Sequence, residues 1–328
     1  MRFLLLLVAA LTASAQRHSL ASTDDGRQLY FAANALIYRI TDAGVEVFAE
    51  IPPNLPGYHD PNIQPALYMP FVSGDGRLVG YNSDAYCPQF YACQPGPYTT
   101  GELRGSISKT LGQGTLSVSH NGRWALLTAR DYGSIYPGPN SFLTDLESGK
   151  QTLVPYQVWA PVWIADDGSI VQFNLYASTV WRPDGVVPLA YPAQPLGVPI
   201  GISADARVVV SQDSAYIGNA TRFFATDLPT GSVTVLELSA TEVHYIALYG
   251  ISNDGQWVLY SRDDRPDTIR LTNTVTAAHT EIPLPAGEML KDAALSGYAN
   301  AAFLLTSSGR ITAVDLENGV ERSRRNVF

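Results

Sequence analysis

One short turn recurs seven times along this chain, and the repeat constrains the fold more than any other feature of the sequence. Most copies read Ser, a variable residue, Asp or Asn, then Gly or Ala, followed by an apolar stretch. The copies lie at residues 22–27, 73–77, 119–123, 165–169, 203–207, 252–256 and, in degraded form, 296–300. The residues that precede the Gly or Ala, beginning with Asp25 and ending with Tyr298, are separated by 38 to 50 residues, which is close to the roughly 40–45-residue period of a four-stranded propeller blade.

Each copy also has the internal order of a blade. An apolar strand enters the turn, Asp-Gly or Asn-Gly supplies the positive-φ residues of a tight hairpin, and a second strand leaves it. A third strand then ends in a second turn, which is clear at 42–44, 145–149, 184–185, 227–231 and 315–319. The second half of the second repeat, between Tyr98 and Leu111, has no clear assignment. We therefore predict an all-β protein, a seven-bladed β-propeller of four-stranded antiparallel blades, that fills residues 16–328 as a single domain.

The composition agrees with this prediction. Only three of the 21 basic residues are Lys and only ten of the 30 acidic residues are Glu, whereas there are 27 Gly and 22 Pro. Lys and Glu are the usual charged residues of exposed helices, so a mostly helical protein is disfavoured. The net charge of −9 argues against a protein that binds nucleic acid.

The turn Ser73-Gly-Asp75-Gly-Arg77 and the later turn Asp145-Leu-Glu-Ser-Gly149 resemble the TolB-like, WD-type propeller repeat. The resemblance extends over residues 18–322 and implies a propeller fold, but it implies no particular function. TolB carries a separate domain before its propeller, and here the first repeat directly follows the leader, so a role in the Tol–Pal system is not implied.

The first 15 residues have the three parts of a secretory signal peptide. A basic start at Arg2 precedes the apolar run 4–11, and Ala13-Ser-Ala15 places small residues before a cleavage site. The alternative is a buried N-terminal strand. The apolar run is shorter than the about 20 residues that cross a bilayer. We therefore expect an exported protein, periplasmic or secreted, with no integral membrane segment.

Cys87 and Cys93 are the two cysteines of the chain, and they fit an oxidising compartment. A disulfide that closes a small loop is the simplest interpretation. A metal site would need further ligands, and a redox pair would more typically have the spacing Cys-x-x-Cys. We predict a structural disulfide and no bound metal or other cofactor.

The longest connections between strands are predicted at the end of the propeller opposite the repeated turns. These segments, 51–64, 82–100 and 130–140, are rich in aromatic residues. Variable loops on a rigid scaffold are common binding sites, and Tyr suits a peptide, glycan or protein surface. The alternative is that the rings pack on one another to hold the loops. The residues are Tyr58, His59, Tyr86, Phe90, Tyr91, Tyr98, Tyr132 and Tyr136.

Charged residues recur where the second strand of several blades ends. Such a ring of carboxylates and guanidiniums near the channel is a candidate site for a cation or a polar ligand, and the alternative is a set of salt bridges between blades. The residues are Asp84, Arg130, Asp131, Asp213, Arg262 and Asp263.

Recognised catalytic motifs are lacking: there is no Gly-x-Ser-x-Gly elbow and no His-Glu-x-x-His, and the His residues are scattered. We therefore expect a binding or scaffold protein rather than an enzyme, with a protein, peptide or glycan as its ligand. The alternative is a propeller hydrolase or lyase that acts on a glycan or lactone with carboxylates at the channel mouth. Two carboxylates, or a His and a carboxylate, that converge around a polar pocket would favour it. A third possibility is one unit of a larger envelope assembly.

Overall fold

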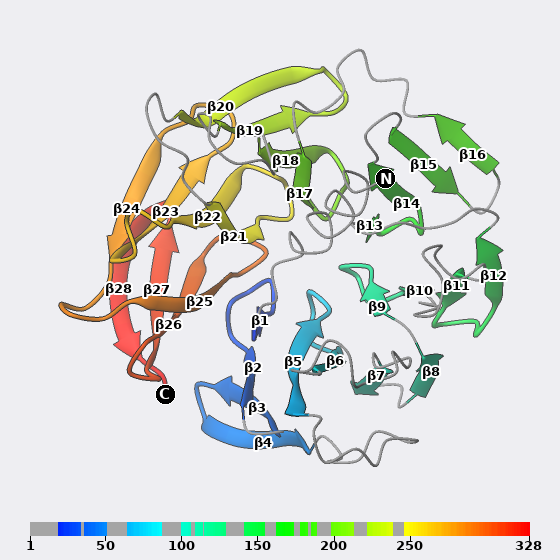
Figure 1. The fold of residues 1–328 in the computed structure, drawn as a ribbon, viewed down its shortest axis with the longest axis horizontal. Helices are drawn as coiled ribbons and strands as arrows, with labels where there is room; N and C mark the ends of the chain where they lie inside the picture. The colour runs from blue at the N-terminus through cyan, green and yellow to red at the C-terminus, as the bar shows by residue number, and fades with distance from the viewer. Residues whose placement is uncertain are drawn as a thin grey trace.

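A computed structural model describes residues 19–33, 36–50, 64–86, 100–105, 109–113, 115–128, 141–154, 162–173, 178–182, 185–188, 198–212, 222–238 and 246–328. These residues form 28 strands in seven four-stranded antiparallel sheets. In Figure 1 the sheets surround a common centre, with the first strand of each sheet innermost. An all-β propeller arrangement of four-stranded antiparallel sheets is therefore confirmed.

We number the sheets 1 to 7 in chain order. Sheet 1 comprises β1 (Leu20–Ser22), β2 (Leu29–Ala33), β3 (Leu36–Thr41) and β4 (Gly44–Glu50), and sheet 2 comprises β5 (Gln64–Val72), β6 (Leu78–Tyr86), β7 (Thr100–Gly105) and β8 (Lys109–Gln113). Sheet 3 comprises β9 (Thr115–Val118), β10 (Trp124–Thr128), β11 (Ser141–Asp145) and β12 (Gln151–Val154). Sheet 4 comprises β13 (Val162–Ile164), β14 (Ile170–Phe173), β15 (Ser178–Arg182) and β16 (Gly185–Pro188).

The remaining three sheets follow the same order. Sheet 5 comprises β17 (Val198–Ile202), β18 (Val208–Gln212), β19 (Arg222–Asp227) and β20 (Ser232–Leu238). Sheet 6 comprises β21 (Ile246–Ile251), β22 (Trp257–Arg262), β23 (Thr268–Asn273) and β24 (His279–Pro283). Sheet 7 comprises β25 (Leu290–Leu295), β26 (Ala301–Thr306), β27 (Ile311–Glu317) and β28 (Val320–Asn326). The half of the second repeat that the sequence left unassigned is thus β7 and β8.

Each repeated turn joins the first and second strands of one sheet, and its side chains explain why it forms. In sheet 2 the buried Ser73 hydroxyl donates to Asp75 Oδ1 at 2.8 Å, and the same oxygen accepts the Arg77 N–H at 3.0 Å. Gly76 takes a φ of 73°, which costs a glycine little. In sheet 1 the hydroxyl of Thr23 donates the equivalent hydrogen bond to Asp25 Oδ1 at 2.8 Å. Thr23, and not Ser22, is therefore the equivalent of Ser73.

The connections divide the molecule into two ends. One end, which we call the turn end, carries the turns between first and second strands and those between third and fourth strands. Because the strands are antiparallel, the opposite end carries the connections between second and third strands and those between sheets. We call it the loop end.

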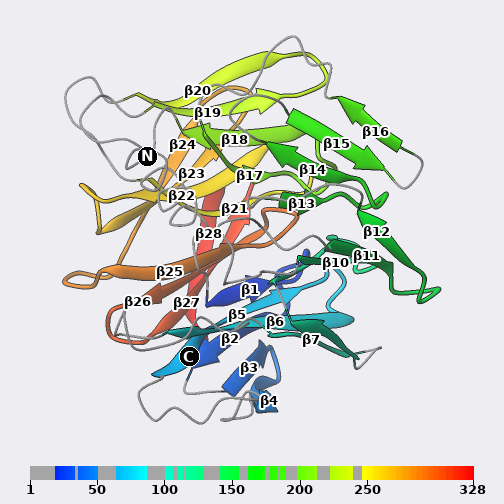
Figure 2. The same cartoon turned by 45° about the vertical axis from the view of Figure 1, so that its right-hand side comes forward.

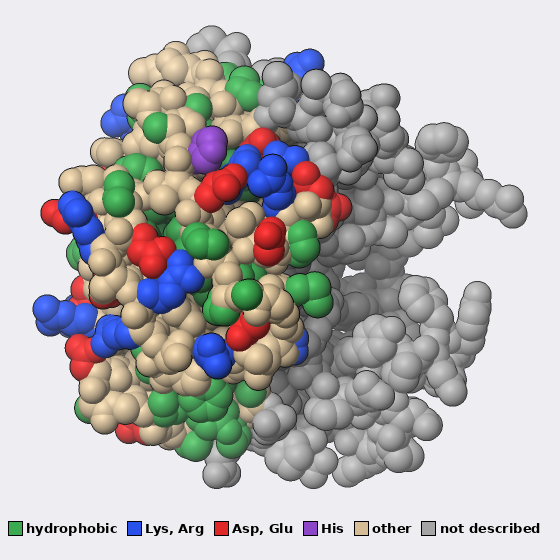
Figure 3. Space-filling model, turned by 90° about the vertical axis from the view of Figure 1, so that its left-hand side faces the viewer, with side chains coloured by type: hydrophobic (Ala, Val, Ile, Leu, Met, Phe, Trp, Pro, Cys, Tyr) green, Lys and Arg blue, Asp and Glu red, His purple; other side chains and the backbone are tan. Residues whose placement is uncertain are grey.

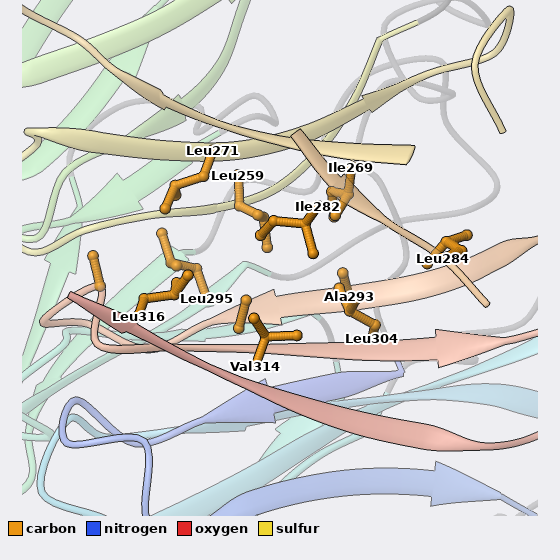
Figure 4. Packing of buried hydrophobic residues seen from close by; sticks show 12 residues of the cluster. Leu259, Ile269, Leu271, Ile282, Leu284, Ala293, Leu295, Leu304, Val314 and Leu316 are labelled. Atoms are coloured by element: carbon orange, nitrogen blue, oxygen red, sulfur yellow. The ribbon is translucent and has the colours of Figure 1, made fainter. Parts of the chain in front are cut away.

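The core lies between neighbouring sheets. Among the described residues, seven clusters of buried apolar side chains each join two consecutive sheets, and one of them joins sheet 7 to sheet 1. Figure 4 shows one cluster, in which Leu259 and Leu271 of sheet 6 face Leu304 and Val314 of sheet 7. Inner strands are accordingly more buried than outermost ones: β18 is buried at every position, whereas the outermost strand β28 is mostly exposed.

Sheets 1 and 7 share no strand, so the ring closes through side-chain packing, an ion pair and hydrogen bonds between them. Figure 2 shows β1 beside β5 and β25. The ring of Phe328 lies 4.9 Å from that of Phe31, between centroids, and Arg325 pairs with Asp42 of sheet 1 at 2.8 Å.

The predicted signal peptide at 1–15 and the predicted disulfide between Cys87 and Cys93 lie outside the described residues. In the part of the chain that the structure describes, no helix has the length and apolar character needed to cross a membrane.

Candidate functional site

Of the predicted charged residues, Asp84, Arg262 and Asp263 lie at or near the end of a second strand, and the others are outside the described residues. Asp84 and Tyr86 belong to β6, of which only the backbone is described at these positions. Arg262 is the last residue of β22 and Asp263 follows it. Outside the described residues lie Tyr58, His59, Tyr91, Arg130, Asp131, Tyr132 and Asp213.

Arg262 belongs to an ion-pair network between sheets 5 and 6. Its Nη1 donates to Glu237 Oε1 at 2.7 Å and its Nη2 donates to Asp264 Oδ2 at 2.7 Å. Arg270 donates to the other oxygen of Glu237, and also to Glu281 Oε1 at 2.8 Å. Figure 3 shows acidic and basic side chains next to each other on this flank of the molecule. We call these five residues the Glu237 network.

The centre of the Glu237 network, which is formed by Glu237 and the two arginines, is only slightly exposed to solvent. The side chains of Glu237 and Arg262 are 12% and 14% exposed. The hydroxyl of Tyr260 donates to Glu237 Oε2 at 3.0 Å, and burial raises the pKa of Tyr260 to about 12. Glu237 is on the outermost strand of sheet 5 and both arginines are in sheet 6. The salt bridge between Arg262 and Glu237 therefore joins two sheets. For Arg262 this agrees with the alternative interpretation of the charged positions, that they form salt bridges between blades.

Backbone hydrogen bonds tie the described connections of sheets 6 and 7 into one surface at the loop end. Leu284 N–H donates to the carbonyl of Asp267 and Ser307 N–H to that of Met289, each at 2.8 Å. The side chain of Met289 is 57% exposed on this surface, and Phe328, which follows the last strand, is 53% exposed. The loop end thus presents apolar side chains on a hydrogen-bonded backbone.

At the turn end, the structure brings together a group of polar side chains that the sequence analysis did not select. His120 Nε2 lies 2.6 Å from Asp24 Oδ1, and His120 Nδ1 lies 3.3 Å from Asp166 Oδ2. All three occupy the second position of a repeated turn, in sheets 3, 1 and 4. They are 96 and 46 residues apart in sequence, and only the closed arrangement of sheets brings them into contact.

Glycines at the same position of two other turns make room for this cluster. A Cβ at Gly74, in sheet 2, would overlap both the Asp24 carboxylate and the His120 ring. A Cβ at Gly297, in sheet 7, would overlap Asp24 and the side chain of Asn253 in sheet 6. The side chain of Asp24 therefore occupies space that a side chain at position 74 or 297 would fill. We call Asp24, His120, Asp166 and Asn253 the turn-end cluster.

The turns that carry the cluster are also joined to one another. The Asp24 N–H donates to the carbonyl of Gly74 at 2.9 Å, and the Gly74 N–H donates to that of His120 at 2.8 Å. The Asn121 N–H donates to Asp166 Oδ1 at 2.7 Å. One series of hydrogen bonds thus connects the turns of sheets 1, 2, 3 and 4.

Hydrogen bonds to Asp166 and Asp24 raise the pKa of His120 to about 9, and they outweigh the effect of its partial burial. His120 is therefore charged at neutral pH. A His beside a carboxylate is the arrangement that an enzyme would need, but both ring nitrogens here face carboxylates, so neither is available to a substrate. Among the described residues, no group of three or more His, Cys, Asp or Glu side chains is arranged to hold a metal ion.

Comparisons with known proteins bear on the fold only. No protein-family model matches the chain, and no curated protein matches it. Solved structures do match: hydrazine synthase from Kuenenia stuttgartiensis superposes with a TM-score of 0.54 over 92% of this chain and 96% of that chain, at 11% sequence identity. At this identity the likeness indicates a shared propeller arrangement and carries no activity with it.

Proposed function

We propose that the seven sheets form one exported, TolB-like propeller of seven blades that binds a protein, peptide or glycan at its loop end, without chemistry of its own. Two exposed residues support this most directly: Met289, on a connection between strands, and Phe328, after the last strand. The backbone of both is held by hydrogen bonds. A surface that is already ordered loses little entropy when a ligand binds.

The two ends of the molecule differ in a way that favours the loop end. At the turn end the polar side chains of Asp24, His120 and Asp166 bond to one another, which leaves them little capacity for a ligand. The described strands on either side of the predicted long connections 51–64, 82–100 and 130–140 have their facing ends at the loop end.

The test compares one exposed residue at each end. The full chain is screened against a glycan array and a phage-displayed peptide library, and the best ligand is then measured with Met289→Ser and Tyr298→Ser. Tyr298, 68% exposed in the turn of sheet 7, is the matched control. We expect Met289→Ser to weaken binding about ten-fold, the loss of one well-buried contact, and Tyr298→Ser to leave it unchanged. Equal affinities for all three proteins would contradict the proposal.

The same screen separates binding from catalysis. If an array glycan is cleaved by the wild-type protein and survives with Asp263→Asn, the molecule is an enzyme and the binding proposal is wrong. If ligands are retained intact, the binding function is supported.

A further inference from the structure

The contact between His120 and Asp24 joins two sheets that are not neighbours. Asp24 is in the turn of sheet 1 and His120 in the turn of sheet 3, and the intervening turn of sheet 2 contributes only Gly74 between them. Asp166 on the other side extends the link to sheet 4. One imidazole therefore bonds directly to side chains from two other sheets, across the turn end of the ring.

The hydrogen-bond chemistry of this contact requires a charged imidazole. An ionised carboxylate can only accept hydrogen bonds, and a neutral imidazole has one N–H and one lone pair. With a carboxylate at each ring nitrogen, the neutral form would point a lone pair at Asp24 or at Asp166. Both contacts are attractive only when both nitrogens carry protons.

We propose that His120 is a proton-dependent latch, which holds the turns of sheets 1 to 4 together when protonated and releases them when it loses its proton. The titratable groups that face it are Asp24, from the turn between β1 and β2, and Asp166, from the turn between β13 and β14. Gly74, from the turn between β5 and β6, brings no side chain. The latch goes beyond the proposed binding function, because it lies at the opposite end of the molecule.

The direction of the pH dependence follows from the pKa of His120. The pKa is raised in the folded protein from 6.5 to about 9. A group with a raised folded pKa stabilises the fold in full below its unfolded pKa. The latch therefore contributes fully below pH 6.5, its contribution falls as the pH rises, and it is lost above about pH 9.

The first measurement is an NMR titration of the His120 ring in the full chain. We expect the ring of His120 to titrate near pH 9, and Asp166→Asn to lower that midpoint by removing one of the two carboxylates. His120 titrating near 6.5 in the wild-type protein, as in an unstructured peptide, would overturn the proposal.

The second measurement is hydrogen exchange of the turn amides of Asp24, Gly74 and Asn121, corrected for the intrinsic pH dependence of exchange. Between pH 7 and pH 10 we expect protection to fall about ten-fold in the wild-type protein. We expect His120→Gln to have low protection at both pH values. The control His279→Gln, on the outer strand β24, should show the same fall in protection as the wild type. An equal fall in the wild type and in His120→Gln would overturn the latch. If His120→Gln does not fold, Asp166→Asn serves instead, with its fall in protection shifted to lower pH.

Discussion

Replacing Glu237 with Gln tests the interpretation that Arg262 is structural. The carboxylate of Glu237 accepts hydrogen bonds from Arg262, Arg270 and Tyr260, and its side chain is 12% exposed. A glutamine of the same shape keeps one acceptor oxygen but presents an NH₂ group to one of the two guanidiniums. The substitution therefore removes a charge and turns one attractive contact into a repulsive one.

The size of the effect follows from the burial. Breaking a buried ion pair by removing one partner costs about 3–5 kcal/mol. Arg262 keeps Asp264, and Arg270 keeps Glu281, so neither guanidinium is left alone. We expect Glu237→Gln to lower the free energy of unfolding by about 2–3 kcal/mol, within the range for hydrogen bonds to charged groups.

Glu281→Gln is the matched control, because Glu281 pairs with the same Arg270 but is 39% exposed. An exposed ion pair contributes about 0–1 kcal/mol. Urea denaturation at pH 7 measures both variants against the wild type, and the midpoint shifts are comparable if the slopes agree. Losses that differ by less than about 1 kcal/mol would refute the view that burial makes Glu237 the centre of the network.

Three further substitutions test the core, the turn end and the start of the chain. Leu259→Ala, at a fully buried position between sheets 6 and 7, should lower the free energy of unfolding by about 2–5 kcal/mol in urea. Asn121→Asp removes the amide that donates to the Asp166 carbonyl at 2.9 Å and adds a carboxylate, so we expect a loss of about 1–2 kcal/mol at pH 7, measured by thermal unfolding. Asp292→Ala removes the buried carboxylate that accepts from the Ser19 hydroxyl at 2.8 Å, and limited proteolysis should then cut the N-terminal segment faster than in the wild type.

The sequence was sufficient to predict an all-β propeller arrangement of four-stranded antiparallel sheets, because the determinants of the repeated turn are local. The Ser73 hydroxyl and the Asp75 carboxylate are two residues apart and satisfy the turn that they belong to. The same contact between a hydroxyl and an Asp carboxylate recurs in sheets 1, 5 and 6, and an Asn side chain is the acceptor in sheets 3 and 7. In sheet 4 the hydroxyl residue is replaced by Ala165. The exception at Thr23 arose because two hydroxyl residues are adjacent in the first copy, and only the hydrogen bonds show which of them is used.

The turn-end cluster could not be predicted in the same way, because its contacts depend on the closed ring. His120 and Asp24 come together only because the turn of sheet 2 has a glycine between them. A signal was nevertheless present: in the seven turns the second position varies between Gly, Ala, Asn, Asp and His, while its neighbours hardly change. In this structure the variable second position supplies the side chains that contact other turns.

Two asparagines that depart from the repeat also bond to a neighbouring turn. Asn121 stands where most copies have Asp, and its amide nitrogen donates to the carbonyl of Asp166 in the next turn. In sheet 7, where Tyr298 replaces the Asp, Asn300 accepts from the Ser296 hydroxyl at 2.6 Å and donates to the carbonyl of Asp25 at 2.9 Å. A carboxylate can accept within its own turn but cannot donate to the next one, whereas an amide does both. The asparagines therefore combine the local role of Asp with a bond between sheets, and the bond made by Asn300 lies where the last sheet meets the first.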